Sequence, residues 1–130
     1  MRYLVDTDWI INYLSGHPGV EVRINSLRSE GLAVSLLSIA ELYEGVHRSR
    51  DPREVEQRLW EFLEGLHVLG LDAETCRIFG RERARLRAAG ALPGDIDLLI
   101  GSTALRYNLT LLTNNRQHFQ RIQGLQVDSL

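Results

Sequence analysis

The sequence contains no lysine, and all 15 basic residues among its 130 residues are arginine. The absence of lysine excludes Schiff-base chemistry, a Walker A phosphate loop and any other mechanism that needs an ammonium group from the chain. The all-arginine usage is also what a GC-rich genome produces, so it does not by itself indicate a function.

Cysteine is almost absent as well, because Cys76 is the only one. It has no partner for an internal disulfide and no metal-ligand spacing, and we expect it to be buried and inert. The sequence also lacks an apolar run of the ~18 residues that a membrane span requires, and it has no signal-peptide pattern. We therefore expect a cytoplasmic protein without membrane contact.

The remaining composition is ordinary for a globular protein, with 44% hydrophobic and 25% charged residues. A chain of this length suits a single domain that spans residues 1–130. The net charge of −2 gives no general attraction to polyanions, so nucleic acid would have to bind to a local patch.

Short apolar runs alternate with helical patterns along the chain. Strands are predicted at residues 3–5, 32–36, 67–71 and 109–113, with a further edge strand near 125–127. Strands separated by helices predict an α/β protein with three α/β/α layers, in which helices cover a mostly parallel sheet of four or five short strands. Functional residues of such sheets gather at the carboxyl ends of the strands.

Acidic residues follow or precede several of these strands. Asp6 ends the first strand, and Glu41 lies in the first turn of the next predicted helix, where Ser38 is expected to form a capping box with it. Parallel strands bring these residues and the polar segment 113–115 to one edge of the sheet. Asp97 lies in the first turn of the helix before the fourth strand. The crossover rule would place it at the opposite edge if that helix were the only connection, so the strand pattern does not bring it to the other acids.

Carboxylates that meet in one pocket repel one another unless a cation neutralises them. Mg²⁺ and Mn²⁺ prefer oxygen ligands, polarise phosphoryl oxygens and lower the pKa of a bound water. The acids therefore indicate metal-dependent hydrolysis of a phosphodiester. No serine-hydrolase elbow, phosphate loop or zinc spacing competes with them.

Each acid also has a structural interpretation. Asp6 could cap the helix that follows it, and Glu41 could be a solvated or capping side chain, because it lies off the apolar stripe of its helix. Asp97 could interact with the N-terminus of its helix, although Asp95 is the expected N-cap.

Four segments resemble the motifs of the PIN-domain family, and in particular its VapC-type ribonucleases. In family order they are MRYLVDTDWIINYLSG, VSLLSIAELYEGV, GALPGDIDLLIGSTAL and TLLTNNRQHF, and together they cover nearly the whole chain. The resemblance implies a PIN-like fold, Mg²⁺ or Mn²⁺ as cofactor and cleavage of structured RNA such as tRNA. It further implies a homodimer and inhibition by a cognate VapB-type antitoxin.

Carried over residue by residue, the resemblance implies metal-binding or catalytic roles for Asp6, Glu41 and Asp97. Asn115 is carried over as a further catalytic-site residue, at a position where many members of the family have a fourth acid and many VapC-type members have asparagine. Activity is therefore expected to survive, with fewer or more weakly bound metal ions. Thr7 and Thr113 match hydroxyls that orient the site, and strand-end capping would explain them equally well. His118 stands where members often have an aspartate, and we assign it no role.

An arginine-rich helical segment offers a candidate RNA contact. Arg77, Arg81 and Arg85 follow an i, i+4 spacing, and Arg83 and Arg87 form a second pair. Arginine suits phosphate, whereas a solvated helix face is the structural alternative.

Two other functions stay open at this point. The VDTD segment superficially matches the opening of aspartate-based phosphatases, although these usually also need a basic residue, commonly lysine. A PIN-like scaffold that binds RNA or protein without activity is the other alternative, and Asn115 in place of an acid is its one support.

Overall fold

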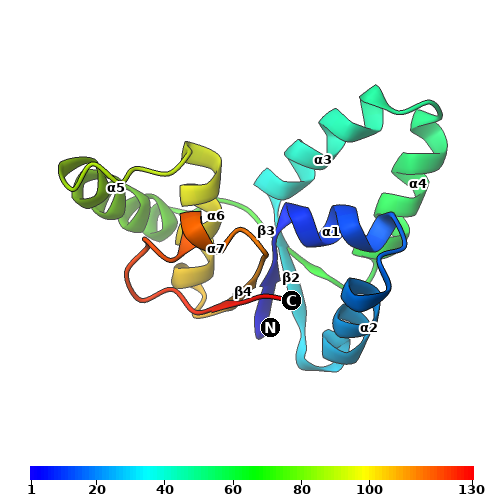
Figure 1. Ribbon diagram of the computed structural model, residues 1–130, viewed down its shortest axis with the longest axis horizontal. Coiled ribbons are helices and arrows are strands. Elements are labelled where there is room, and N and C mark those ends of the chain that lie inside the picture. Colours follow the sequence, from blue (N-terminus) through cyan, green and yellow to red (C-terminus); the bar gives the residue numbers. More distant parts are fainter.

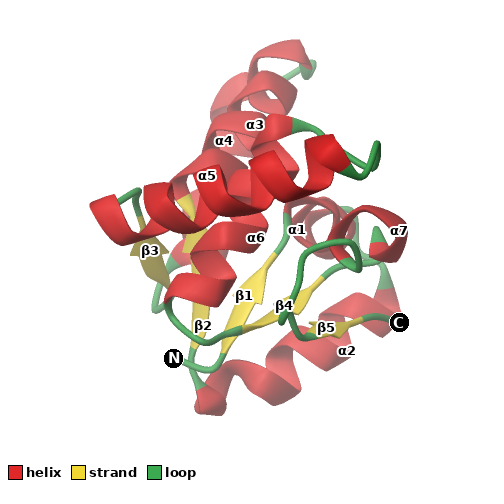
Figure 2. Ribbon diagram, turned by 90° about the vertical axis from the view of Figure 1, so that its left-hand side faces the viewer, coloured by secondary structure: helices red, strands yellow, loops and turns green.

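The computed structural model describes residues 1–130 and contains one five-stranded sheet. The strands lie in the order β3-β2-β1-β4-β5, and every neighbouring pair is parallel. Figure 2 shows the strands side by side, with β5 near the C-terminus. Their bounds are Tyr3–Val5 (β1), Leu32–Ser35 (β2), His67–Leu69 (β3), Thr110–Leu112 (β4) and Val127–Asp128 (β5).

Helices cover both faces of the sheet, which gives the three-layer α/β/α fold that the sequence predicts (Figure 1). One face carries Thr7–Leu14 (α1), Pro18–Leu27 (α2), the 3-10 turn Arg28–Glu30, Leu36–Arg48 (α3) and Pro52–Leu63 (α4). The other carries Ala73–Ala88 (α5), Asp95–Arg106 (α6) and Arg116–Phe119 (α7). No helix is both long and apolar enough to cross a membrane.

Alternation along the central strands builds two hydrophobic cores. Leu4 and Leu111 pack on the α5–α7 side, whereas Val5 and Leu112 pack on the α1–α4 side. All four side chains are fully buried. The central strands β1 and β4 are therefore covered on both faces, and their carboxyl ends are held firmly at one edge.

Helix caps follow the expected chemistry at some positions and not at others. Asp51 and Asp72 cap α4 and α5, each accepting a hydrogen bond from a backbone N–H in the first turn. The prediction that Ser38 caps α3 is wrong: Ser35 is the N-cap, because β2 ends there and the helix starts immediately. Asp95 is likewise not the N-cap of α6, since Gly94 precedes the helix and Asp95 is its first residue.

Asp97 lies at the carboxyl edge of the sheet, and the opposite edge that the crossover rule suggested for it is wrong. A helix that runs antiparallel to the strands and precedes a parallel strand must begin at the carboxyl edge. Helix α6 begins at Asp95 and leads into β4, so Asp97 in its first turn lies at the same edge as Asp6.

The expectation of a buried cysteine is also wrong, because Cys76 is exposed. Helix α5 turns Thr75, Glu82 and Leu86 inward. Cys76 projects from the solvent side of the same helix.

Candidate active site

Asp6 lies at the junction of β1 and α1 and is almost completely buried, with 5% of its surface exposed. Its Oδ1 accepts a hydrogen bond of 2.8 Å from the backbone N–H of Thr7, so Asp6 does cap α1. Its Oδ2 accepts a second bond of 2.7 Å from the Thr113 hydroxyl at the end of β4. One side chain therefore caps α1 and also joins the end of β4.

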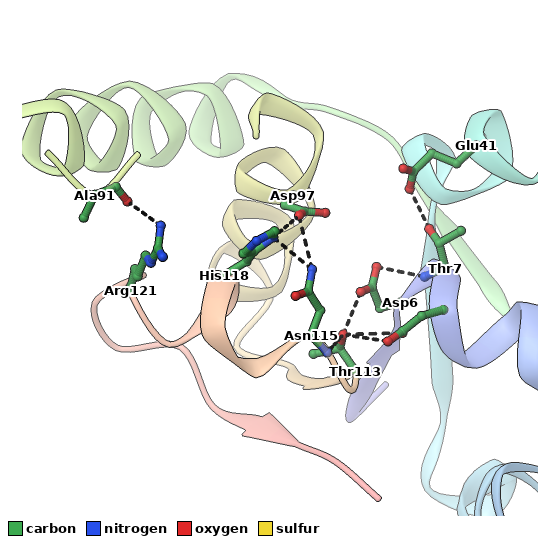
Figure 3. Close-up of polar contacts among 10 residues, drawn as sticks. Asp6, Thr7, Glu41, Ala91, Asp97, Thr113, Asn115, His118 and Arg121 are labelled. Atoms are coloured by element: carbon green, nitrogen blue, oxygen red, sulfur yellow. Dashed lines mark hydrogen bonds and ion pairs between the residues drawn. The ribbon is translucent and has the colours of Figure 1, made fainter. Parts of the chain in front are cut away.

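A chain of hydrogen bonds joins Asp6 to Asp97 (Figure 3). The hydroxyl of Thr113, which donates to Asp6, accepts from the backbone N–H of Asn115 at 3.0 Å. The Asn115 side chain in turn places Nδ2 3.4 Å from Oδ2 of Asp97. Asp6, Thr113, Asn115 and Asp97 thus form one connected group.

Glu41, on α3, contacts Thr7, the residue that follows Asp6. Its Oε1 accepts a 2.7 Å hydrogen bond from the Thr7 hydroxyl, which ties α3 to the start of α1. Because α3 starts at Leu36, Glu41 lies beyond the first turn and takes no part in capping the helix. The Ser38 hydroxyl, expected to cap the helix, is buried without a hydrogen-bond partner.

The electrostatic environment of Asp6 opposes its ionisation. Burial, together with the charges of Asp8 and Asp97, raises its pKa from 3.8 to about 7, against the opposing effect of the hydrogen bonds from Thr113 and Thr7. No arginine pairs with Asp6, Asp8, Glu41 or Asp97, and the only basic side chain that touches any of them is His118. The site therefore has an excess of negative charge.

Asp8 is a site residue that the sequence analysis missed. Its carboxylate accepts hydrogen bonds from the backbone N–H groups of Trp9, at 2.8 Å, and Asn114, at 2.9 Å. Burial raises the pKa of Asp8 as well. The second acid in the VDTD segment was the available signal, because residues at i and i+2 around a strand–helix junction remain near one another.

His118 was also missed as a contributor. Its Nδ1 lies 3.0 Å from Oδ2 of Asp97 and 3.0 Å from Nδ2 of Asn115. The spacing from Asn115 to His118 is one turn of the short helix α7, and this spacing was the signal that could have found it.

The donor chemistry of the site suits a hard divalent cation, since it offers carboxylate oxygens whose charge is not compensated. No three His, Cys, Asp or Glu side chains lie close enough together to hold one metal ion. The acids are therefore not arranged as a closed three-carboxylate shell. Mg²⁺ commonly uses one or two carboxylates and retains several waters, so the residues fit an ion of this kind.

The arginines expected to bind RNA lie on α5. Arg77 pairs with Glu74 at 2.6 Å, and Arg85 makes a bidentate pair with Glu82, which is only 1% exposed. Arg81 lies 3.9 Å from the same Glu82. RNA contact by these three arginines stays a prediction.

Comparisons with known proteins agree with this architecture. The model of the PIN domain matches residues 3–125. "Ribonuclease VapC2" of Rickettsia felis is 33% identical over 129 residues, which cover 96% of this chain and 95% of the relative. The "tRNA(fMet)-specific endonuclease VapC" of Shigella flexneri is 28% identical over 98% and 97% of the two chains.

A solved structure extends the likeness to three dimensions. The crystal structure of VapBC2 from Rickettsia felis, bound to a DNA fragment from its promoter, contains a chain that superposes with a TM-score of 0.93. That chain is 30% identical, and the match covers 100% of this chain and 99% of the other. The chain therefore belongs to the PIN-domain family, and within it to the VapC type.

Proposed function

We propose that the protein is a metal-dependent endoribonuclease that hydrolyses phosphodiester bonds of structured RNA, as the toxin of a type II toxin–antitoxin pair. The observation that carries this proposal is the group of carboxylates at the carboxyl edge of the sheet with no arginine to neutralise it. Such a group favours a divalent cation and, with it, a phosphate group of the substrate.

The proposed ligands are Asp6 and Asp97, with Glu41 acting through water. An Mg²⁺ or Mn²⁺ ion, when bound, supplies a Lewis acid for the phosphoryl oxygen and lowers the pKa of a water. The hydroxyl of Thr113 fixes one oxygen of Asp6, and that of Thr7 fixes Glu41. Asn115 contributes a neutral amide beside Asp97, so it orients this carboxylate without adding charge.

The names of the relatives support the choice of substrate and partners. A relative named as a tRNA(fMet)-specific endonuclease supports tRNA as the substrate, and the VapBC complex supports a VapB-type antitoxin as the inhibitor. We further propose a homodimer that acts in the cytoplasm, as the family resemblance implies.

Incubation of the purified protein with an initiator tRNA transcript tests the activity. We expect discrete cleavage with Mg²⁺ or Mn²⁺, no cleavage with EDTA, and a loss of at least about 100-fold for Asp6→Asn and Asp97→Asn. Asp51→Asn is the matched control, because it makes the same change at an exposed N-cap and asparagine caps helices equally well. Full activity of Asp97→Asn would contradict the assignment.

The inactive scaffold remains the alternative, favoured by Asn115 where many members of the family have an acid. It predicts RNA binding without cleavage under every metal tested. Expression in bacteria separates the two further, because toxicity that Asp6→Ala relieves requires an active site.

A further inference from the structure

Helix α5 presents two different arginine surfaces. One, here called the Arg83 face, carries Cys76, Gly80, Arg83, Ala84 and Arg87 at spacings of three and four residues. Gly80, Arg83, Ala84 and Arg87 line a shallow hollow of about 350 Å³. A Cβ atom at Gly80 would meet no atom within 4 Å, so the helix surface there is open.

Contacts with neighbouring elements show where the two edges of α5 point. Nε of Arg83 lies 3.0 Å from Oδ1 of Asp95, two residues before Asp97 at the start of α6. Arg85, on the opposite edge, donates to the backbone oxygen of Arg121, beyond α7. The Arg83 face therefore borders the beginning of α6, which carries Asp97, whereas the Arg85 edge borders the segment after α7.

The arginines of the two surfaces also differ in how strongly each guanidinium is already paired with a carboxylate. Arg87 is exposed and forms no ion pair, and Arg83, whose side chain is 33% exposed, pairs with an aspartate that is 60% exposed. An ion pair with a mostly exposed carboxylate is weak and exchanges readily for another anion. Arg85, by contrast, is held by the buried carboxylate of Glu82.

We propose that the Arg83 face binds the phosphodiester backbone of the RNA substrate beside the acidic site. Arg83 and Arg87 lie one turn apart, and each guanidinium can bind a phosphate through two hydrogen bonds. Gly80 and Ala84 leave the space in which the backbone approaches the helix. The proposal rests on the proposed ribonuclease function and assigns the contact to different arginines from Arg77, Arg81 and Arg85.

RNA binding without cleavage provides the first test. Affinity for an initiator tRNA transcript is measured in EDTA at several salt concentrations. We expect Arg83→Gln/Arg87→Gln to weaken binding about tenfold and to reduce the slope of log K against log salt by about 1.4, at ~0.7 per lost phosphate contact. Arg87→Gln alone should reduce the slope by about half as much.

Two other variants guard against a general charge effect. Arg2→Gln removes one charge from an exposed pair at the amino edge of the sheet, and it should change the affinity less than twofold. Arg77→Gln/Arg81→Gln removes two charges from the other surface of α5. If this double variant loses as much affinity as the Arg83/Arg87 variant, or more, the proposal is wrong.

Gly80→Leu tests the hollow itself. Leucine has the higher helix propensity, Gly80 is exposed and a Cβ atom there meets no neighbour, so the melting temperature should rise or stay unchanged. RNA binding should nevertheless weaken several-fold, because the side chain fills the hollow. Undiminished binding by a stable Gly80→Leu protein would contradict the proposal.

The native thiol gives an independent readout, since Cys76 lies on the Arg83 face one turn before Gly80. A benzophenone attached to Cys76 should photo-crosslink to the tRNA. The same group on Ser26→Cys in a Cys76→Ser background should not, because Ser26 lies on α2 across the sheet. Crosslinking at Ser26 alone would overturn the proposal. Cleavage by the unmodified protein with no effect of these variants refutes this inference alone, whereas absence of any cleavage refutes the proposed function.

Discussion

Nδ2 of Asn115 lies 3.4 Å from Oδ2 of Asp97, so an amide that can donate hydrogen bonds faces a carboxylate inside the candidate active site. An aspartate at position 115 would place a second negative charge there instead. The neutral amide therefore limits the charge of the site and stabilises Asp97 when no cation is bound.

Asn115→Asp should strengthen metal binding and weaken the metal-free fold. The added carboxylate offers another oxygen ligand, but without a cation it repels Asp97. We expect about tenfold tighter Mn²⁺ binding by calorimetry and a lower melting temperature in EDTA. Asn25→Asp, an exposed change on α2, is the control and should alter neither quantity in this way. Unchanged Mn²⁺ affinity would exclude position 115 from the metal site.

Asp6→Asn should stabilise the metal-free protein at neutral and higher pH. Asp6 has a pKa of about 7 in the folded protein, above its value of about 3.9 in the unfolded chain, so its stabilising contribution is lost as the pH rises through 7. Asparagine does not ionise, so the variant keeps its stability as the pH rises. The difference in free energy of unfolding between the variant and the unmodified protein should grow from pH 4 to a plateau above pH 7, with an upper limit of about 4 kcal/mol.

Urea unfolding in EDTA across this pH range measures the difference for Asp6→Asn. Asp51→Asn serves as the comparison at an exposed cap, where no such growth is expected. A stability difference that does not change between pH 4 and pH 8 would show that Asp6 titrates normally in the folded state.

Thr113→Val should impair the site while the strand keeps its shape. Valine has nearly the same volume and suits the end of β4, but it removes the hydroxyl that donates to Asp6 and accepts from Asn115. The groups left without partners should reduce the free energy of unfolding by about 1–3 kcal/mol. We expect cleavage to fall at least tenfold, whereas Thr113→Ser, which keeps the hydroxyl, should restore most of it. Equal activity of Thr113→Val and Thr113→Ser would show that the Thr113 hydroxyl has no role in cleavage.

Arg85→Gln should cost more stability than Arg77→Gln. Arg85 compensates a carboxylate that is nearly completely buried, and its loss should destabilise the fold by about 1–3 kcal/mol. Arg77 pairs with an exposed glutamate, and such pairs contribute about 0–1 kcal/mol. Chemical denaturation of both variants decides whether Arg85 is chiefly structural, and equal stabilities would contradict that role.

The local pattern of the sequence was sufficient to predict the strands and helices and part of the candidate site. Apolar runs with intervening helical spacing predicted the parallel sheet, because buried strands and amphipathic helices have distinct periodicities. Asp6 and Thr113 were predictable as neighbours, since both end parallel strands. Asp6 was recognisable as a helix cap from its place between the first strand and the helix that follows.

Only the tertiary structure decided which side chains share a contact across the chain. His118 lies against Asp97, the Asp8 carboxylate accepts a hydrogen bond from the backbone N–H of Asn114, and Arg85 pairs with Glu82. These contacts depend on the directions of side chains from elements that are distant in sequence, whereas periodicity fixes only the face of each element on which a residue lies. For the same reason the sequence could not show that Arg85 pairs with the buried Glu82 or that Arg83 contacts Asp95 at the start of α6.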